Sequence, residues 1–175
     1  MAGCRALLIQ SAHPEVVDGF WQHSNLMNDP IGRISRTGEY VAVTSFGSMP
    51  EVKRMVAMVK KVHEKVVGVS SRGIKYSANQ PNLNAWVHYA LVQSFLKAYQ
   101  LYGDAELSTE DANRFVKEQT KLAKLMNIDE LITSEAELNH WMHHHPQLGT
   151  TEATMNVIKF LKKPPIKPSM MLGYN

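Results

Sequence analysis

Apolar residues recur along most of this chain with the spacing of an α-helix, and no long segment alternates as a half-buried strand does. The clearest pattern runs from about Pro50 to Val67, where one face is rich in valine and the other carries five Lys and Arg residues. Gly68 then predicts the end of this helix. The sequence therefore predicts an all-α fold, arranged as a helical bundle.

Further helices are predicted where a capping residue or a proline precedes an apolar stripe. Ser108 is followed by Asp111, and Ser134 is followed by Glu137, so each pair has the pattern of a helix start. The piece over 32–46 is either helical or irregular. The other predicted helices lie at about 6–11, from 14 onward, and at 81–102, 108–126, 134–145 and 150–163.

Composition indicates one folded domain with a sizeable core. Of 175 residues, 44% are hydrophobic and 20% are charged, which excludes a disordered chain. The net charge of +3 is too small to indicate a nucleic-acid partner. No apolar run approaches the roughly 20 residues that cross a bilayer. A single cysteine, Cys4, excludes an intrachain disulfide, and the N-terminus lacks a secretory pattern, so we expect an intracellular location.

Charge is segregated along the chain. Between Lys53 and Lys75 seven Lys and Arg residues face one acid, Glu64, whereas nine acids face four bases between Asp104 and Glu137. The basic part could bind an anionic ligand, and the alternative is two solvated helix faces. We place one domain at residues 1–165. Residues 166–175 form a predicted C-terminal tail, with no acid and no periodic pattern.

Two histidines lie on apolar helix faces. The chain has no phosphate loop, dinucleotide-binding fingerprint, nucleophile elbow or HExxH motif. The histidine side chains are therefore the main candidates for catalytic or metal-binding residues. His63 follows Val59 by four residues and precedes Val66 by three, and His88 sits similarly near Leu91. Each ring could hydrogen-bond within the core, or it could bind a haem iron in an apolar pocket.

Two other constellations carry candidate chemistry. His140 and His144, with Glu137 one turn earlier, have the spacing of a zinc-binding pair, although histidines are also favourable at an exposed helix end. Within Gly32–Thr37, two guanidiniums and a hydroxyl could hold a carboxylate or an oxygen species, and the alternative is a solvated surface turn. The residues of this second group are Arg33, Arg36 and Thr37.

A series of motifs, in order through nearly the whole chain, resembles the DUF2236 family. This family groups the endoplasmic-reticulum-bound oxygenase of mycophenolic acid biosynthesis with the catalytic domain of rubber oxygenases. The motifs are Arg5–Gln10, His13-Pro14, Gly32–Thr37, Val62–Gly68, Tyr76-Ser77-Ala78, Pro81 with Trp86-Val87-His88, and Pro164-Pro165. The resemblance implies a globin-like helical fold that holds haem b and uses dioxygen to cleave double bonds of isoprenoid chains.

The resemblance also implies roles for individual residues. It makes His63 the ligand of the haem iron and places Arg33, Arg36 and Thr37 on the oxygen side. Arg36 stands where rubber oxygenases have a lysine, and a guanidinium does not deprotonate to bind iron. His88 belongs to the pocket wall or supports the iron ligand, and axial ligation by His88 is the fallback.

We therefore expect a haem b-dependent oxygenase that acts with dioxygen on an apolar substrate, such as a prenyl chain. Characterised relatives continue on both sides of the matched stretch, so we also expect this domain to lack flanking helices. The alternative is a non-catalytic helical module in which both histidines are core residues and the basic helix face binds an acidic partner. The sequence predicts neither the individual substrate nor the oligomeric state.

Overall fold

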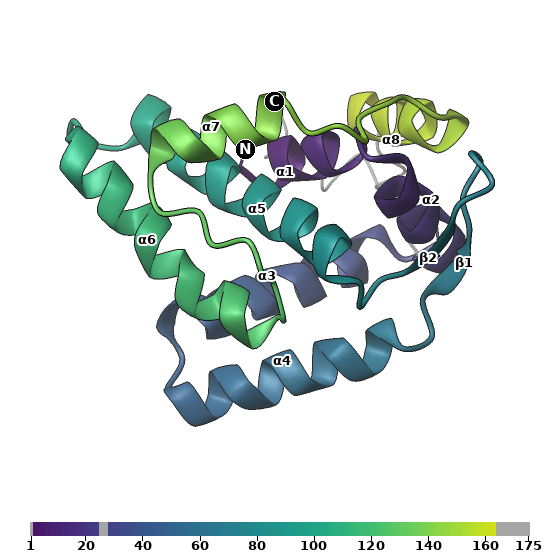
Figure 1. Ribbon diagram of the computed structural model, residues 1–175, viewed down its shortest axis with the longest axis horizontal. Coiled ribbons are helices and arrows are strands. Elements are labelled where there is room, and N and C mark those ends of the chain that lie inside the picture. Colours follow the sequence, from purple (N-terminus) through teal and green to yellow (C-terminus); the bar gives the residue numbers. More distant parts are fainter. Residues whose placement is uncertain (1, 25–27, 164–175) are drawn as a thin grey trace.

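The computed structural model describes residues 2–24 and 28–163, which form eight helices and one two-stranded hairpin (Figure 1). In chain order these elements are α1 (Ala2–Gln10), α2 (Pro14–His23), α3 (Pro30–Phe46), α4 (Met49–His63), β1 (Val67–Val69), β2 (Lys75–Ser77), α5 (Pro81–Tyr102), α6 (Thr109–Leu125), α7 (Glu135–His143) and α8 (Glu152–Lys162). The predicted all-α class is confirmed, whereas the likeness to globins stays a prediction. The predicted tail at 166–175 lies outside the described residues.

The central helix is α5, and α1, α6 and α7 pack against it (Figure 1). Trp86 and Tyr89 of α5 are almost completely buried. Their polar atoms are satisfied, because Trp86 Nε1 donates to the carbonyl of Gln10 and Tyr89 Oη donates to that of Glu130. A helix that is buried around most of its circumference forms the core of the fold.

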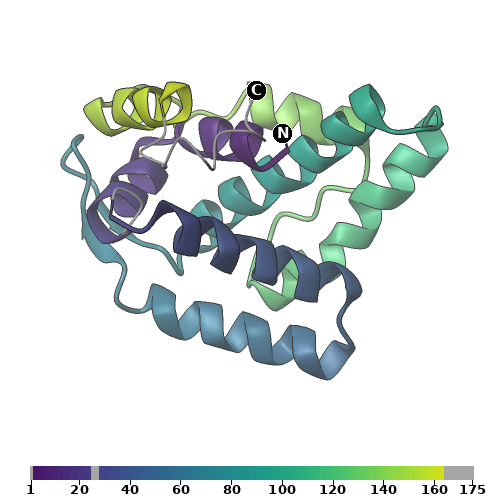
Figure 2. The ribbon, with the colours of Figure 1, turned by 180° about the vertical axis from the view of Figure 1, so that it is seen from behind.

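Helices α3 and α4 form an antiparallel pair at the edge of the molecule (Figures 1 and 2). The side chain of Asp29 caps α3 by accepting a hydrogen bond from the backbone N–H of Gly32, at 2.9 Å. Ser48 and Glu51 form a capping box that begins α4. One face of α4 contributes Val52 and Val56 to the main core, so the helix pair is anchored mainly through α4.

The predicted helix starts at Ser108 and Ser134 are confirmed. Ser108 accepts a hydrogen bond from the backbone N–H of Asp111 at 3.1 Å, and Ser134 accepts one from Glu137 at 3.2 Å. The segment around 32–46, which the sequence left open, is helical. Among the described residues, no helix is long and apolar enough to span a bilayer.

The prediction of one helix from Pro50 to Val67 was wrong at its C-terminal end. Helix α4 ends at His63, and Val67 begins strand β1, which pairs antiparallel with β2. The carbonyl of Lys60 accepts a hydrogen bond from the side chain of Asn79 at 3.0 Å, which fixes the end of the helix against the segment after β2. The valines after His63 continue the apolar spacing but favour a strand.

Candidate active site

A cavity of about 590 Å³ lies between the α3–α4 pair and the rest of the fold. This volume is in the range of small-molecule and cofactor sites. Side chains from five helices, α1 to α5, line it, together with strand β2 and the end of α6. Most of the lining is apolar, with Phe20, Met55, Val59, Leu83, Val87 and Leu91 among its residues.

All five predicted site residues line this one cavity. They come from three helices: Arg33, Arg36 and Thr37 from α3, His63 from α4 and His88 from α5. The structure therefore brings these residues together, although Arg33 and His88 are 55 positions apart in the sequence (88 − 33). Which chemical role each residue has stays a prediction.

His63 is the last residue of α4, and its half-buried ring faces inward as the apolar stripe predicts. Its Nδ1 atom is buried and has no hydrogen-bond partner among the described residues. Burial lowers the pKa of His63, the positive charge of Arg33 lowers it further, and a backbone group of Ala78 partly offsets both effects. The ring is therefore neutral near pH 7, which is the state that binds metals.

His88 lies deeper than His63 and is only 6% exposed. Burial lowers its pKa to about 4, and an interaction with the backbone of Gln119 offsets only part of that effect. Its Nε2 atom has no partner among the residues that the structure describes. A buried polar atom without a partner is costly, and such atoms are frequently found where a ligand or water is needed.

Arg33 and Thr37 lie one turn apart on α3 and interact directly. The guanidinium of Arg33 donates to the hydroxyl of Thr37, which in turn donates to the Arg33 carbonyl at 3.1 Å. The guanidinium also lies over the ring of Phe20, 5.3 Å from its centroid. These contacts hold a cation with several free donors against the apolar cavity wall.

Arg36 occupies the rim of the cavity. Its side chain is 58% exposed, and it pairs with Asp29, the residue that caps α3, at 3.4 Å. The weak, solvated contact leaves the guanidinium able to turn toward a ligand. Arg33 is thus the half-buried cation of this motif, and Arg36 is the exposed one.

Other ionisable residues line the cavity that the sequence reasoning did not select as site residues, and Glu15 and His23 are two of them. Glu15 follows the His13-Pro14 motif on α2 and is 3% exposed. His23, at the end of α2, contacts the Val67 carbonyl through Nε2 at 3.1 Å and lies edge-on to Tyr76. The family motif that contains His13 and Pro14 was the only sequence signal near these residues.

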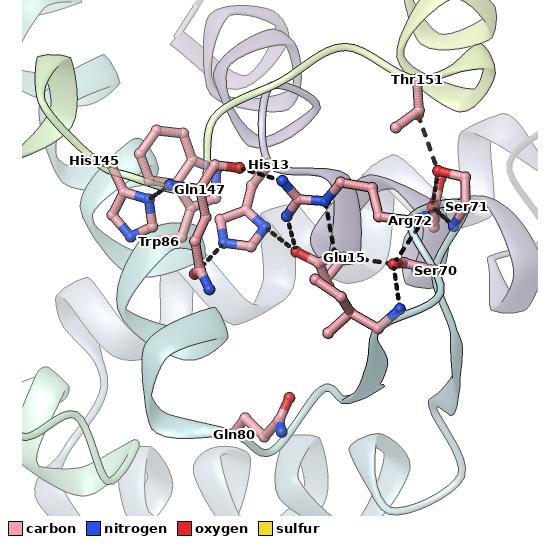
Figure 3. Close-up of polar contacts among 12 residues, drawn as sticks. His13, Glu15, Ser70, Ser71, Arg72, Gln80, Trp86, His145, Gln147 and Thr151 are labelled. Atoms are coloured by element: carbon pink, nitrogen blue, oxygen red, sulfur yellow. Dashed lines mark hydrogen bonds and ion pairs between the residues drawn. The ribbon is translucent and has the colours of Figure 1, made fainter.

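Glu15 is the centre of a buried polar network behind the cavity wall (Figure 3). One of its oxygens accepts from Ser70 Oγ at 2.9 Å and from Arg72 Nε at 3.2 Å. Its other oxygen pairs with a terminal nitrogen of Arg72. Burial alone would raise the pKa of Glu15, but the hydrogen bonds from Arg72 and Ser70 outweigh it and lower the pKa, so the carboxylate stays ionised.

His13 extends this network toward the loop after α7. It is fully buried, its Nε2 atom lies 3.1 Å from the side-chain oxygen of Gln147, and its ring packs against Trp86 and His145 (Figure 3). Its Nδ1 atom is 3.4 Å from Glu15 without hydrogen-bond geometry. The network therefore joins α2, the hairpin and the α7–α8 loop, and it holds the wall of the cavity in place.

The histidine cluster near the end of α7 lies elsewhere. His143 and His144 contact the backbone carbonyls of Asn139 and His140 through Nδ1, and the rings of His140 and His144 stack. Glu137 accepts a hydrogen bond from the backbone of Thr133. Over residues 2–24 and 28–163 no group of three or more His, Cys, Asp and Glu side chains is arranged to hold a metal ion.

Comparison with known proteins places these motifs in a family. The profile of the family described as ER-bound oxygenase mpaB/B'/Rubber oxygenase, catalytic domain, matches residues 1–174. Two uncharacterized mycobacterial proteins, from Mycobacterium bovis and Mycobacterium tuberculosis, are each 32% identical to this chain over 89 residues.

The matched segment covers 50% of this chain and 35% of each mycobacterial relative, so it spans about a third of their length. No solved structure matches the chain significantly. The family profile nevertheless covers nearly the whole sequence and includes every motif that carried the resemblance. The chain belongs to the family of ER-bound oxygenases and rubber oxygenase catalytic domains.

Proposed function

We propose that this chain is a haem b-dependent oxygenase domain that uses dioxygen to cleave double bonds of an apolar, isoprenoid-type substrate. The observation that carries this proposal is one apolar cavity lined by His63, His88 and Arg33 together. The chain belongs to an oxygenase family, and an oxygenase could use imidazoles to bind a metal cofactor and a guanidinium to hold an oxygen species.

The residues in the cavity fit a haem group. Two imidazoles, of His63 and His88, have a buried nitrogen without a protein partner, and burial keeps both rings neutral. A neutral imidazole in an apolar wall is the ordinary axial ligand of haem iron. His63 would hold the iron, and the haem, when bound, would supply the dioxygen chemistry.

Arg33 provides the hydrogen-bond donors on the α3 side of the cavity. One of its donors is used by Thr37, and the fork of a guanidinium has five. Burial lowers the pKa of Arg33, and the nearby Arg36 lowers it further, but a guanidinium remains charged at physiological pH. It can therefore stabilise a negative or polar oxygen atom in the cavity, and Thr37 fixes its direction.

Arg36 has a different role in this proposal. A guanidinium does not deprotonate, so Arg36 would not bind a haem iron as a lysine could. From its exposed position on the rim it can instead pair with an acidic group of a ligand. The apolar residues of α4 and α5 then exclude water and hold the hydrocarbon part of the substrate.

The proposal is tested with squalene, an isoprenoid with double bonds, and squalane, its saturated counterpart. Haem-loaded protein should consume dioxygen with squalene and form two carbonyl groups for each oxygen molecule used, as measured with an oxygen electrode and a hydrazine reagent. Thr37→Val removes the hydroxyl that fixes the direction of Arg33 and should lower the rate, by less than the roughly 10²- to 10³-fold that loss of a preorganised donor itself costs. The exposed control His144→Ala should leave the rate unchanged.

The result that would contradict the proposed function is oxygen uptake that is equal with squalene and squalane, or absent with both although haem is bound. In either case the cavity would serve something other than double-bond cleavage.

A further inference from the structure

Helix α4 carries a group of exposed basic residues on its outer side. Lys53, Ala57 and Lys61 follow one another at four-residue spacing and are exposed, opposite the buried residues Val52 and Val56. Residues four apart lie on the same helix face. Arg54 on α4 and Lys65, two residues after the helix ends, are also exposed, and with Lys53 and Lys61 they form what we name the basic face.

Within the described part of the chain, the lysines of the basic face are not paired with neighbouring acids, whereas the charge of Arg54 acts on Glu51 at the start of α4. Lys53, Lys61 and Lys65 make no ion pair with any residue that the structure describes, and Glu51 at the start of α4 is occupied by the capping box with Ser48. In both ribbon views α4 runs along the edge of the molecule, with its outer side unpartnered (Figures 1 and 2). A row of cations at a free edge favours an extended anionic surface.

Apolar side chains project at the N-terminal end of the same helix. Phe46, the last residue of α3, is 91% exposed, and Met49, the first residue of α4, is 52% exposed. Exposing the apolar ring of Phe46 to water at this helix–helix corner is energetically unfavourable. The apolar face of α4 packs in the core, so the part that a membrane could take up is the exposed apolar side chains beside the basic residues, and such apolar area adds to electrostatic attraction at an anionic membrane surface.

The candidate cavity reaches the surface beside this helix. Met58 and Val62 of α4 and Arg36 of α3 line the cavity and are also exposed. A surface that rests on a bilayer here would bring the cavity close to the source of an apolar ligand. This last step rests on the proposed function, whereas the docking surface does not.

We infer that the basic face of α4, with Phe46 and Met49, is a docking surface for an anionic phospholipid bilayer. The lysines and Arg54 contact lipid phosphates and carboxylates, and Phe46 enters the boundary between headgroups and acyl chains. Attraction by each basic residue near such a surface is worth about a fivefold factor in partitioning. The contact is peripheral and therefore depends on lipid charge and on salt.

The test is flotation of the full chain, with and without haem, on vesicles of phosphatidylcholine alone or of phosphatidylcholine with the anionic lipid phosphatidylserine. We expect binding to the anionic vesicles at least about tenfold stronger than to the neutral ones, and its loss in high salt. Haem occupancy, measured by absorbance in the same samples, separates a failure of docking from a failure of the proposed function.

Two variants and a matched control identify the surface. Lys53→Glu with Lys61→Glu should weaken binding at least about 25-fold, because two attractive charges are removed and reversed. Phe46→Ser should weaken it without changing the charge. Lys117→Glu with Lys121→Glu alters the net charge equally but on the exposed side of α6, and it should leave most of the binding intact.

Three results would overturn the inference. They are equal binding of the wild type to neutral and anionic vesicles, equal losses in the α4 and α6 double variants, and capture by soluble polyglutamate without any binding to vesicles. The last outcome would assign the basic face to an acidic protein instead. Circular dichroism of each variant shows that a loss of binding is not a loss of fold.

Discussion

Two arginine–carboxylate pairs of this protein differ in burial, and burial determines what each contributes to stability. The Glu15 side chain in its pair with Arg72 is 4% exposed, whereas the side chains of Arg36 and Asp29 are 58% and 46% exposed. Arg72→Met leaves a buried carboxylate without its cation and should lower the free energy of unfolding by about 3 kcal/mol. Arg36→Met should change it by less than about 1 kcal/mol.

Urea unfolding of the two haem-free variants measures this contrast. Equal, small effects would show that water reaches Glu15 and that the network of Figure 3 does not hold the cavity wall.

The buried histidines make stability depend on pH. Burial lowers the pKa of His88 to about 4, below the value of about 6.5 in an unfolded chain. The unfolded state therefore binds the proton first, so the contribution of His88 is complete above pH 6.5 and is lost as pH falls toward 4. His88→Leu should remove about 2.5 kcal/mol of this pH-dependent loss of stability, measured by urea unfolding at pH 7.5 and 4.5.

The variant should keep part of the acid sensitivity, because burial also lowers the pKa values of His13, His63 and His145. A His88→Leu protein with the full pH dependence of the wild type would contradict the neutral, buried state of this ring.

At the residue scale, sequence reasoning found the cavity residues that lie on regular helix faces. His63 and His88 could be placed because a helical stripe fixes which side chains point inward, and Arg33 and Thr37 because a family motif marked them. The Glu15–Arg72 pair could not be found in this way. The partners are 57 residues apart, and only the folded hairpin brings Arg72 to α2.

At the scale of elements, local signals decided most helix boundaries. Serine caps and first-turn prolines act within one turn, so the sequence alone is sufficient to place α5, α6 and α7. The hairpin was missed because Val66 and Val67 fit the stripe of α4 as well as they fit a strand. What ends α4 at His63 includes a contact from Asn79, which no local pattern reveals.

Two exposed glycines test the local backbone of a turn and a helix. Gly73, in the hairpin turn, has a φ of +76°, a backbone conformation that residues with a side chain disfavour. Gly38 lies within helix α3. A Cβ added at either position would have no atom within 4 Å, so neither substitution causes a clash. Gly73→Ala should destabilise the fold by about 1 kcal/mol. Gly38→Ala should stabilise it by about 0.5–1 kcal/mol, because alanine favours a helix.

Thermal unfolding of the two alanine variants provides the comparison, since the substitution is identical and only the backbone differs. Shifts of the melting temperature in the same direction would contradict the turn geometry.

At the scale of the whole molecule, the cavity is a product of assembly. Helices α3 and α4 close it from one side, α1, α2 and α5 form the other walls, and the polar network around Glu15 fixes α2 to the hairpin and to the α7–α8 loop. Each element has local signals that favour its folding, but imidazoles and guanidiniums share one cavity only when all these elements are in place. This dependence is why the site's volume and depth could not be derived from the sequence.

The central claim is that His63 holds a haem iron in this cavity, and a haemin titration followed by absorbance tests it most directly. The wild type should saturate at one haemin per chain, with a Soret band that shifts on reduction and addition of carbon monoxide. His63→Ala should lose this binding while its far-ultraviolet circular dichroism stays helical, and His144→Ala should titrate as the wild type does. A His63→Ala protein that binds haemin with an unchanged affinity and spectrum would contradict the account.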